Sequence, residues 1–210
     1  MVHPRTCVIR PRGREVHTMK LRASLILCLF PLFFSVAACD DGGGGDNNPS
    51  PLTAEEQAAF DYTNFARTDP QGFATQYLYD LHQSGSDNGA YDDLMARDPV
   101  PALQLSPGLL AAARAHSRDL NENCKVLQHD SCDGTSWSDR IWSYYDGGTI
   151  AENAAMGFST GLSVVIAWIV DSGVPSLGHR VNLLNGTYTQ VGIGQAGSYW
   201  TQDFGAGGTN

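Results

Sequence analysis

The sequence predicts an α+β domain in which helices precede a small antiparallel sheet. Helix-start signals lie early: residues 53–56 form a capping box, and Ser106, followed by a proline, caps a later helix. Two β-rich runs lie late, at 188–194 and 198–204, and the glycine between them is typical of a hairpin. Helices and strands that are segregated along a chain favour helices packed on the faces of an antiparallel sheet.

Each expected element follows from a local pattern. The first helix ends before Pro70, because the residue before a proline disfavours helical geometry, and Gly, Asn and Asp clusters at 84–100 indicate a long loop. Apolar residues at helical spacing indicate the other helices, and an apolar run around Glu152 indicates a strand. In chain order, the expected elements are a helix from Thr53, a helix over 71–82, the loop, a helix over 108–122, a short helix from Ser136, a strand over 149–158, a helix containing 164–169, and the hairpin.

Residues 19–39 resemble a bacterial lipoprotein signal peptide. Lys20 and Arg22 give a positive start, an apolar core too short to span a bilayer follows, and Val-Ala-Ala-Cys39 ends the segment like a lipobox. We expect Cys39 to be lipidated and to become the mature N-terminus; the alternative is an ordinary secretory signal in which Cys39 is incidental. The expected location is the bacterial cell envelope, with Cys39 as membrane anchor and the domain facing the periplasm or the extracellular space.

The flanking segments complete the predicted organisation. Residues 1–18 precede Met19 and are interpreted as an over-extended gene start. Residues 40–51 are rich in Gly, Asp, Asn and Pro, which cannot bury apolar surface, so they should form a flexible tether. One domain, residues 52–210, follows and is long enough to enclose a single hydrophobic core.

The expected mature chain is strongly acidic. The full chain has a formal charge of −9, from 13 basic and 22 acidic residues. Residues 1–39 hold six of the basic residues and one of the acidic ones, so the remainder carries a formal charge of −14. Such a domain is a poor candidate for binding nucleic acid or an anionic bilayer surface, whereas a metal ion or another cationic ligand would be attracted to it.

Two cysteines, Cys124 and Cys132, belong to the domain. In an oxidising envelope they should form a disulfide across a short loop, which would stabilise the fold by about 2–3 kcal/mol in loop-closure terms. His129 lies inside that loop, so the bond would restrict where its imidazole can lie.

Four titratable residues form the candidate site: His129, Glu152, Asp171 and His179. No short motif such as HExxH joins them, but imidazoles and carboxylates are the side chains that exchange protons or hold a divalent cation near neutral pH. On residue type alone, a structural role is favoured over a functional one for the two histidines, because buried histidines usually just satisfy hydrogen bonds. The surrounding motifs add the missing information.

Those motifs resemble the CAP superfamily, named for cysteine-rich secretory proteins, antigen 5 and pathogenesis-related 1 proteins, and in particular its bacterial extracellular branch. The most specific matches are Gly-His-Arg-x-Asn at 178–182, Ala-Glu-Asn at 151–153 and Tyr-Trp-Thr-Gln-Asp-Phe at 199–204. Residues 63–71 also resemble the family's first helix and turn. The resemblance covers residues 52–205 and implies an SCP-like α-β-α sandwich with a small antiparallel sheet between helical layers.

The resemblance also implies a cavity lined by two histidines and two acidic residues, which fall here on His129, Glu152, Asp171 and His179. In some members the two histidines coordinate zinc, and other members bind sterols or other lipids. Zinc or another divalent metal is therefore the implied cofactor, with His129 and His179 as its ligands. This chain departs from the pattern twice: Ala151 replaces the glycine usual before Glu152, and Asp171 stands where the longer glutamate is common.

Two other patterns favour simpler explanations. His116 lies on the predicted third helix among charged neighbours, where packing or a surface position is favoured over ligation. Gly-Phe-Ser159-Thr-Gly matches the nucleophile elbow of serine hydrolases, and Ser159, Asp171 and His179 follow the hydrolase order. That elbow needs a larger parallel sheet than the remaining residues can build, so serine hydrolysis is disfavoured.

Three functions remain. Binding ranks first: an envelope-tethered domain whose cavity takes a lipid-like small ligand or a divalent metal. A structural or interaction role in the envelope ranks second, with the four residues only stabilising the fold. Metal-assisted hydrolysis of a peptide or cell-wall substrate, with Glu152 as base, ranks third because the sequence offers no convincing nucleophile. The sequence therefore favours a protein that is not an enzyme.

Overall fold

The computed structural model describes residues 51–209; the predictions for 1–18, 19–39 with its Cys39, and 40–50 lie outside the described residues. Within the described range, no helix is both long enough and apolar enough to cross a membrane. The described chain folds around a four-stranded sheet with strand order β1-β3-β4-β2. Its strands are β1 (Gln104–Leu105), β2 (Thr149–Met156), β3 (Gln190–Ala196) and β4 (Tyr199–Ala206).

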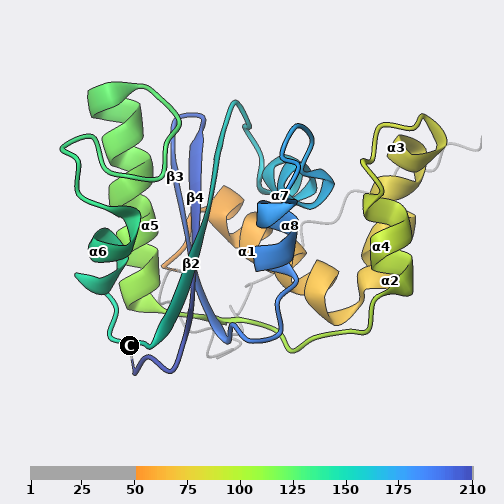
Figure 1. Ribbon diagram of the computed structural model, residues 1–210, viewed down its shortest axis with the longest axis horizontal. Coiled ribbons are helices and arrows are strands. Elements are labelled where there is room, and N and C mark those ends of the chain that lie inside the picture. Colours follow the sequence, from red (N-terminus) through yellow and green to blue (C-terminus); the bar gives the residue numbers. More distant parts are fainter. Residues whose placement is uncertain (1–50, 210) are drawn as a thin grey trace, which may run out of the picture. The chain divides into compact units, whose positions relative to one another are not determined.

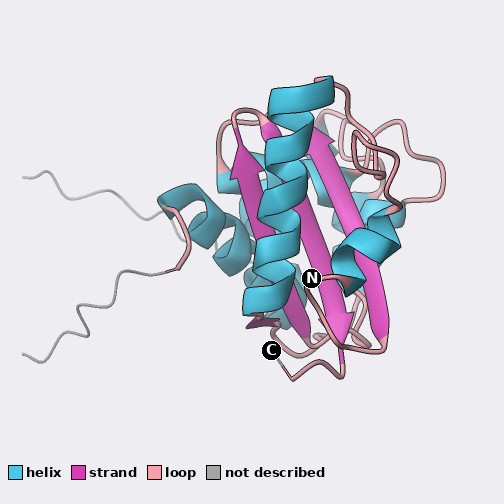
Figure 2. Ribbon diagram, turned by 90° about the vertical axis from the view of Figure 1, so that its left-hand side faces the viewer, coloured by secondary structure: helices cyan, strands magenta, loops and turns pink. Residues whose placement is uncertain are grey.

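Helices cover both faces of this sheet and form the α-β-α sandwich that the sequence predicts (Figure 1). α5 and α6 lie on one face, and the long helix in front of the strands in Figure 2 is α5. α1, α7 and α8 lie on the other face. The helical elements are α1 (Ala54–Thr68), α2 (Pro70–Phe73), the π-helical turn η1 (Ala74–Leu78), α3 (Tyr79–Gln83), α4 (Ala90–Ala96), α5 (Pro107–Asp119), the π-helical turn η2 (Leu120–Cys124), α6 (Trp137–Trp142), α7 (Gly161–Val170) and α8 (Gly178–Leu183).

The predicted helix starts are confirmed by their capping hydrogen bonds. At α1 the Thr53 amide donates to Glu56 Oε2 at 2.9 Å, and the Glu56 amide donates to Thr53 Oγ1 at 3.2 Å. At α5 the hydroxyl of Ser106 accepts from the Leu109 amide at 3.3 Å. Ser136 caps α6 in the same way. These side chains satisfy amides that the first turn of a helix leaves without partners.

The predicted long loop over 84–100 is wrong in its middle, where α4 forms. Its polar composition conceals Ala90 and Leu94, which are both fully buried in the main core. Asp87 helps to start the helix, because its carboxylate accepts from the Tyr91 amide at 2.9 Å. Two buried residues on one short helix give too weak a periodic pattern to outweigh the surrounding turn-forming residues.

The sheet also differs in one respect from the purely antiparallel arrangement expected. β2, β3 and β4 are antiparallel to their neighbours, but β1 pairs in parallel with β3, with Gln104 opposite Gln190 and Leu105 opposite Val191. A strand of two residues has no alternation to detect in a sequence. The short helix α8 was likewise not predicted.

Two glycines allow α5 to lie directly on the sheet. A Cβ added to Gly192 would lie 2.0 Å from the carbonyl carbon of Leu109, and one added to Gly194 would lie 2.4 Å from the amide nitrogen of Arg114. Only glycine permits so close a backbone approach. β3 and β4 form the predicted hairpin, and Gly197 adopts a φ of +58° in its turn.

The main hydrophobic core lies between the sheet and the layer that contains α1 and α7. Its largest fully buried side chains include Trp168, Trp200, Phe73 and Phe204. A smaller cluster that includes Ile141 packs α6 against α5 on the opposite face. The sheet is therefore covered on both sides, and its edge strand β2 is the strand that carries Glu152.

Arg67, near the end of α1, is only 1% exposed and joins distant parts of the chain. Its guanidinium donates five hydrogen bonds of 2.8–3.1 Å to the carbonyl oxygens of Pro101, Leu183, Asn185 and Tyr188. Burial lowers the pKa of Arg67 to about 10, so the side chain is still charged at neutral pH. One buried cation thus fixes α1 to the segments before β1 and β3.

Candidate functional site

The first pair of the candidate site joins His129 to Glu152. Glu152 lies on β2 and is buried, whereas His129 lies in the loop between η2 and α6 with 53% of its side chain exposed. His129 Nδ1 is 2.8 Å from Glu152 Oε1. This hydrogen bond raises the pKa of His129 above its usual value, against the opposing effect of burial.

The second carboxylate oxygen of Glu152 is bound by Arg140, a buried residue of α6. Arg140 Nη1 also donates to the carbonyl oxygen of His129 at 2.9 Å and to Ser131 Oγ at 3.2 Å. One guanidinium therefore fixes the acid and the loop that carries its histidine. Nothing in the sequence marks Arg140 as a site residue except its position three residues after Trp137, on the face of α6 that packs inward.

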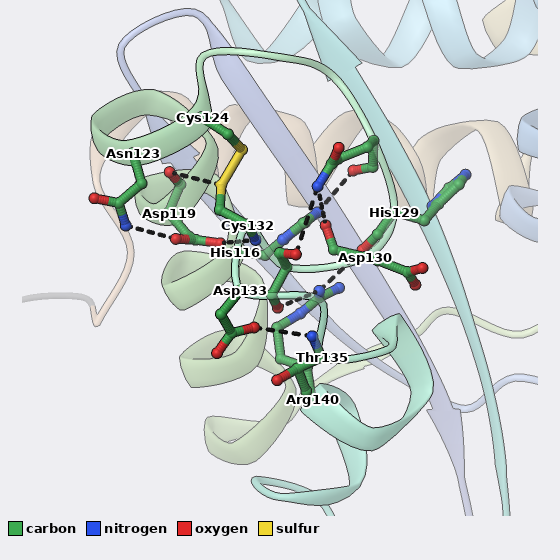
Figure 3. The surroundings of a disulfide bond; sticks show 12 residues. His116, Asp119, Asn123, Cys124, His129, Asp130, Cys132, Asp133, Thr135 and Arg140 are labelled. Carbon is green, nitrogen blue, oxygen red and sulfur yellow. Dashed lines mark hydrogen bonds between the residues drawn. A yellow bond between two sulfur atoms is a disulfide. The ribbon is translucent and has the colours of Figure 1, made fainter.

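The predicted disulfide between Cys124 and Cys132 is present, with Cα atoms 5.7 Å apart. Figure 3 shows the His129 imidazole pointing away from the disulfide, on the side of the loop that reaches Glu152. Asp119 of α5 accepts a hydrogen bond from the Cys132 amide at 2.7 Å. The bridge and this hydrogen bond hold the loop against the end of the α5 segment.

Replacing Cys124 and Cys132 together by serine should lower the free energy of unfolding by about 2–3 kcal/mol. The bridge closes a loop with a sequence separation of 8, and opening it returns conformational entropy to the unfolded chain. Denaturant unfolding of the variant and of the wild type at neutral pH measures the loss, and the wild type in a reducing agent is the matched control. A loss below about 1 kcal/mol would show that hydrogen bonds such as that of Asp119 hold the loop without the bridge.

The second pair joins Asp171 to His179. Asp171 ends α7 in a left-handed conformation with a φ of 52° and is only 2% exposed. Its Oδ1 is 2.7 Å from His179 Nδ1, and its Oδ2 accepts from the amides of His179 at 2.9 Å and Arg180 at 3.3 Å. The aspartate thus reaches the imidazole despite its shorter side chain, because α8 starts directly beside it.

Arg180 anchors α8 to the end of α7 and to the turn before α4. It is buried, and its guanidinium donates to the carbonyl oxygens of Ile169 at 2.5 Å, Val170 at 3.1 Å and Asn88 at 3.0 Å. The arginine of the Gly-His-Arg run therefore holds the end of α7 and the turn before α4, while the preceding histidine pairs with Asp171.

Two side-chain amides connect the pairs. Asn153 Nδ2 donates to the carbonyl oxygen of His179 at 3.1 Å. Asn182 Nδ2 donates to Asn153 Oδ1 at 3.0 Å and to the carbonyl oxygen of Glu152 at 3.3 Å. The asparagines of the Ala-Glu-Asn and Gly-His-Arg-x-Asn motifs thus bind β2 and α8 to each other. Both asparagines belong to the motifs that carry the family resemblance, but the motifs alone do not indicate this position in the site.

The four predicted site residues form two pairs that border two cavities. His129 and Glu152 line a cavity of about 310 Å³, and Asp171 and His179 line one of about 210 Å³. Both cavities border β2 and α8. The second cavity is largely apolar, and the apolar side chains that line it include Leu127, Ala154, Ala155, Met156, Phe158, Ala167, Trp168 and Val174. That all four residues line a single cavity stays a prediction.

Each pair presents its imidazole to a ligand in the same way. Nδ1 is engaged by a carboxylate, so a neutral ring carries its proton there and keeps a lone pair on Nε2. Within residues 51–209, no group of three or more His, Cys, Asp or Glu side chains is arranged to hold a metal ion. A closed zinc site with a full set of protein ligands is therefore not formed by the described residues.

His116 and Ser159, which the sequence disfavours as site residues, both lie where the structure gives them another role or lacks what the site would need. His116 of α5 is fully buried, and its Nε2 donates to the carbonyl oxygen of Gln128 at 3.0 Å. Burial lowers the pKa of His116, so its ring is neutral at neutral pH. Ser159 follows β2, which is antiparallel to its neighbour β4, and it precedes Thr160, the N-cap of α7. The parallel strand that a nucleophile elbow requires is not found at this point.

Comparison with known proteins identifies the family. The model of the cysteine-rich secretory protein family, CAP, matches residues 60–204. A curated relative named "Uncharacterized protein YkwD" from Bacillus subtilis (strain 168) is 37% identical over 105 residues, which are 49% of this chain and 38% of that protein. "Uncharacterized membrane protein YlbC" from the same organism is 36% identical over 93 residues, or 44% of this chain and 25% of that protein.

A solved structure supports the same assignment. It is an extracellular protein containing an SCP domain from Bacillus anthracis str. Ames, with a TM-score of 0.53 and 25% identity over 75% of this chain and 45% of that chain. The matched region is thus less than half of each of these three proteins. The family match spans more than half of this chain and includes all four predicted site residues. The chain therefore belongs to the cysteine-rich secretory protein family and carries a CAP, or SCP-like, domain.

Proposed function

We propose that this domain is a binding module of the bacterial cell envelope that takes a divalent cation, zinc above all, through Nε2 of His129 and His179. The observation that carries the proposal is the shared geometry of the two pairs, in which a buried carboxylate holds Nδ1 at 2.8 Å and 2.7 Å. A carboxylate in that position orients the ring and makes Nε2 a better donor to a metal. Water would complete the coordination, as in other open zinc sites.

Charge and rigidity support this assignment. The expected mature chain carries a formal charge of −14, which raises the local concentration of cations around it. The amides of Asn153 and Asn182 tie β2 to α8, so the two pairs keep a fixed relation to each other. A ligand site whose groups are already held in place loses less entropy on binding.

A lipid-like small ligand is the second candidate, and one observation favours it. The cavity beside His179 is lined mainly by apolar side chains such as Met156, Phe158 and Trp168, with Asp171 and His179 as its charged or titratable members. An apolar cavity with a few polar groups is suited to a ligand with an apolar body and a polar end. Metal-assisted hydrolysis ranks behind both, because His129 and Arg140 already engage the two carboxylate oxygens of Glu152, the base that it would need.

The envelope location is part of the same proposal. A lipidated Cys39 would anchor the chain to a membrane and leave the domain in the periplasm or outside the cell. The Cys124–Cys132 disulfide suits an oxidising compartment, and the Bacillus anthracis protein with the similar domain is described as extracellular.

Zinc titration followed by calorimetry tests the proposed function. The wild-type protein should give a saturable heat, and His129→Ala and His179→Ala should each weaken the affinity at least about tenfold, the range expected for loss of a group that supports a metal. His82→Ala is the matched control, since His82 of α3 pairs with Asp87 and stacks on Tyr91 of α4.

Absence of a zinc-dependent heat, or an affinity unchanged in both site variants, would contradict metal binding. The second candidate would then be favoured if a fatty acid or sterol bound the wild type and lost this binding when a larger side chain was introduced to fill the apolar cavity. Stability lost in the two histidine variants, with binding of neither ligand class detected, would leave only the structural role.

A further inference from the structure

A second buried carboxyl group lies beside Glu152. Asp203 of β4 is directly opposite Glu152 of β2 in the antiparallel register, so the two side chains project from the same face of the sheet. Asp203 is 0% exposed and Glu152 is 6% exposed. On its other side Asp203 faces Gly192 of β3, which contributes no side chain. The pair is therefore enclosed between the sheet and the layer formed by α5 and α6.

The two carboxyl groups have very different partners. Glu152 accepts hydrogen bonds from His129 and Arg140. Within the part of the chain that the structure describes, neither oxygen of Asp203 meets a hydrogen-bond donor. A buried carboxylate without donors is costly, and a carboxylate beside another carboxylate is more costly still. Of the two groups, Asp203 is therefore the one that should retain a proton.

The charges that surround the pair lead to the same conclusion. α6 contributes Arg140, the loop after η2 contributes His129, and α5 contributes His116, whose Nε2 is 4.0 Å from Glu152 Oε1. His116 is neutral because burial lowers its pKa, so Arg140 is the single permanent cation among these groups. One cation balances one carboxylate. Burial first, and then the negative charge of Glu152, raise the pKa of Asp203 well above its usual value.

We propose that Asp203 is a positioning residue of the His129–Glu152 pair: a neutral carboxylic acid that donates a hydrogen bond to the Glu152 carboxylate. A hydrogen bond from Asp203 on β4 would keep the Glu152 carboxylate from rotating, so that one of its oxygens accepts from Arg140 and the other from His129. The importance of this for ligand binding rests on the proposed function of His129, whereas the protonation of Asp203 does not. Asp203 is the aspartate of the motif Tyr-Trp-Thr-Gln-Asp-Phe, so this role would explain one residue of that motif.

The direct test is NMR of the full chain with ¹³C-labelled Asp and Glu carboxyl groups, assigned through the backbone and titrated between about pH 4 and pH 8. The Asp203 carbon should stay in its protonated range above about pH 6, where ordinary aspartates have long ionised. This signal needs no zinc and no variant. An Asp203 carbon that ionises near pH 4, or a doubly protonated His116 ring at neutral pH, would overturn the proposal.

Stability measurements on Asp203→Asn give a second readout, because asparagine reproduces the neutral, hydrogen-bonding form. Wild-type Asp203 keeps its proton when folded and loses it when unfolded above about pH 4, so the folded state binds one more proton. Relative to Asp203→Asn, the unfolding equilibrium of the wild type should therefore move about tenfold toward the unfolded state per pH unit above about pH 4. A ratio that does not change with pH would contradict a retained proton.

The positioning role is separated from a packing role by comparing Asp203→Asn with Asp203→Leu. Asparagine still donates to Glu152, so the pKa of His129 should stay at its wild-type value. Leucine has no donor, which leaves Glu152 a stronger acceptor and should shift the pKa of His129 upward. Equal His129 titrations in the two variants would reject positioning. If zinc fails to bind while these signals appear, only the proposed function is lost.

Discussion

Replacing Arg67 by methionine should lower the free energy of unfolding by about 3–5 kcal/mol, as expected for removal of a buried, fully hydrogen-bonded charge. Methionine can fill the space of the aliphatic stem, so the loss reports the guanidinium. Its removal leaves the carbonyl oxygens of Pro101, Leu183, Asn185 and Tyr188 without their donor, and those of Leu183 and Tyr188 belong to buried residues. Urea unfolding monitored by tryptophan fluorescence measures the change.

Arg118→Met is the matched control, because Arg118 lies on the exposed face of α5. It should alter stability by no more than about 0.5 kcal/mol, as is usual for surface substitutions. Arg67→Lys adds a second comparison: lysine keeps the charge but lacks the planar guanidinium fork that reaches four carbonyl groups. If lysine restored most of the stability, charge and not geometry would be the main contribution of Arg67.

Replacing Arg140 by methionine should also cost about 3–5 kcal/mol at neutral pH, since it removes the buried cation that pairs with Glu152. The variant also loses the hydrogen bonds to the His129 carbonyl and to Ser131, so the loop should become more mobile. Arg140 lowers the pKa of His129 through its positive charge, and in the variant this pKa should therefore rise further. Chemical denaturation and NMR titration of the His129 ring measure the two effects.

The loss in Arg140→Met should depend on pH in a defined direction. The pKa of His129 is raised in the folded state, so its charged pair with Glu152 stabilises the fold below about pH 6.5 and fades as pH rises through the folded pKa. In the variant, protonated His129 remains the cation that faces Glu152 at low pH. Arg140→Met should thus cost less near pH 5 than near pH 8, and a cost that is equal at both pH values would contradict this coupling.

Sequence patterns sufficed where a signal is local. The capping residues Thr53, Ser106 and Ser136 each marked a helix start, and two β-rich runs separated by a glycine turn predicted the β3–β4 hairpin. α4 and β1 could not be predicted from the sequence, because the conformation of each segment depends on what it packs against. Two buried residues, Ala90 and Leu94, decide the first, and a neighbouring strand decides the second.

The site was predictable to a similar extent. Motif resemblance located the residues that pair as His129 with Glu152 and Asp171 with His179, but it gave no means to say which acid meets which histidine. The arginines that hold those acids and loops, including Arg140, look like ordinary solvated charges in the sequence. Their roles come from burial, which only the packed structure supplies.

The position of β4 in the sheet has a consequence for the order of events during synthesis and folding. β4 follows all other described strands in the chain yet lies between β2 and β3, so neither β2 nor its Glu152 has a neighbour in the sheet until residues 199–206 are available. Pairing β2 with β4 also brings together segments about 50 residues apart, which is slow to form. During folding, β2 should therefore stay an unpaired, aggregation-prone strand until the last strand of the sheet is in place.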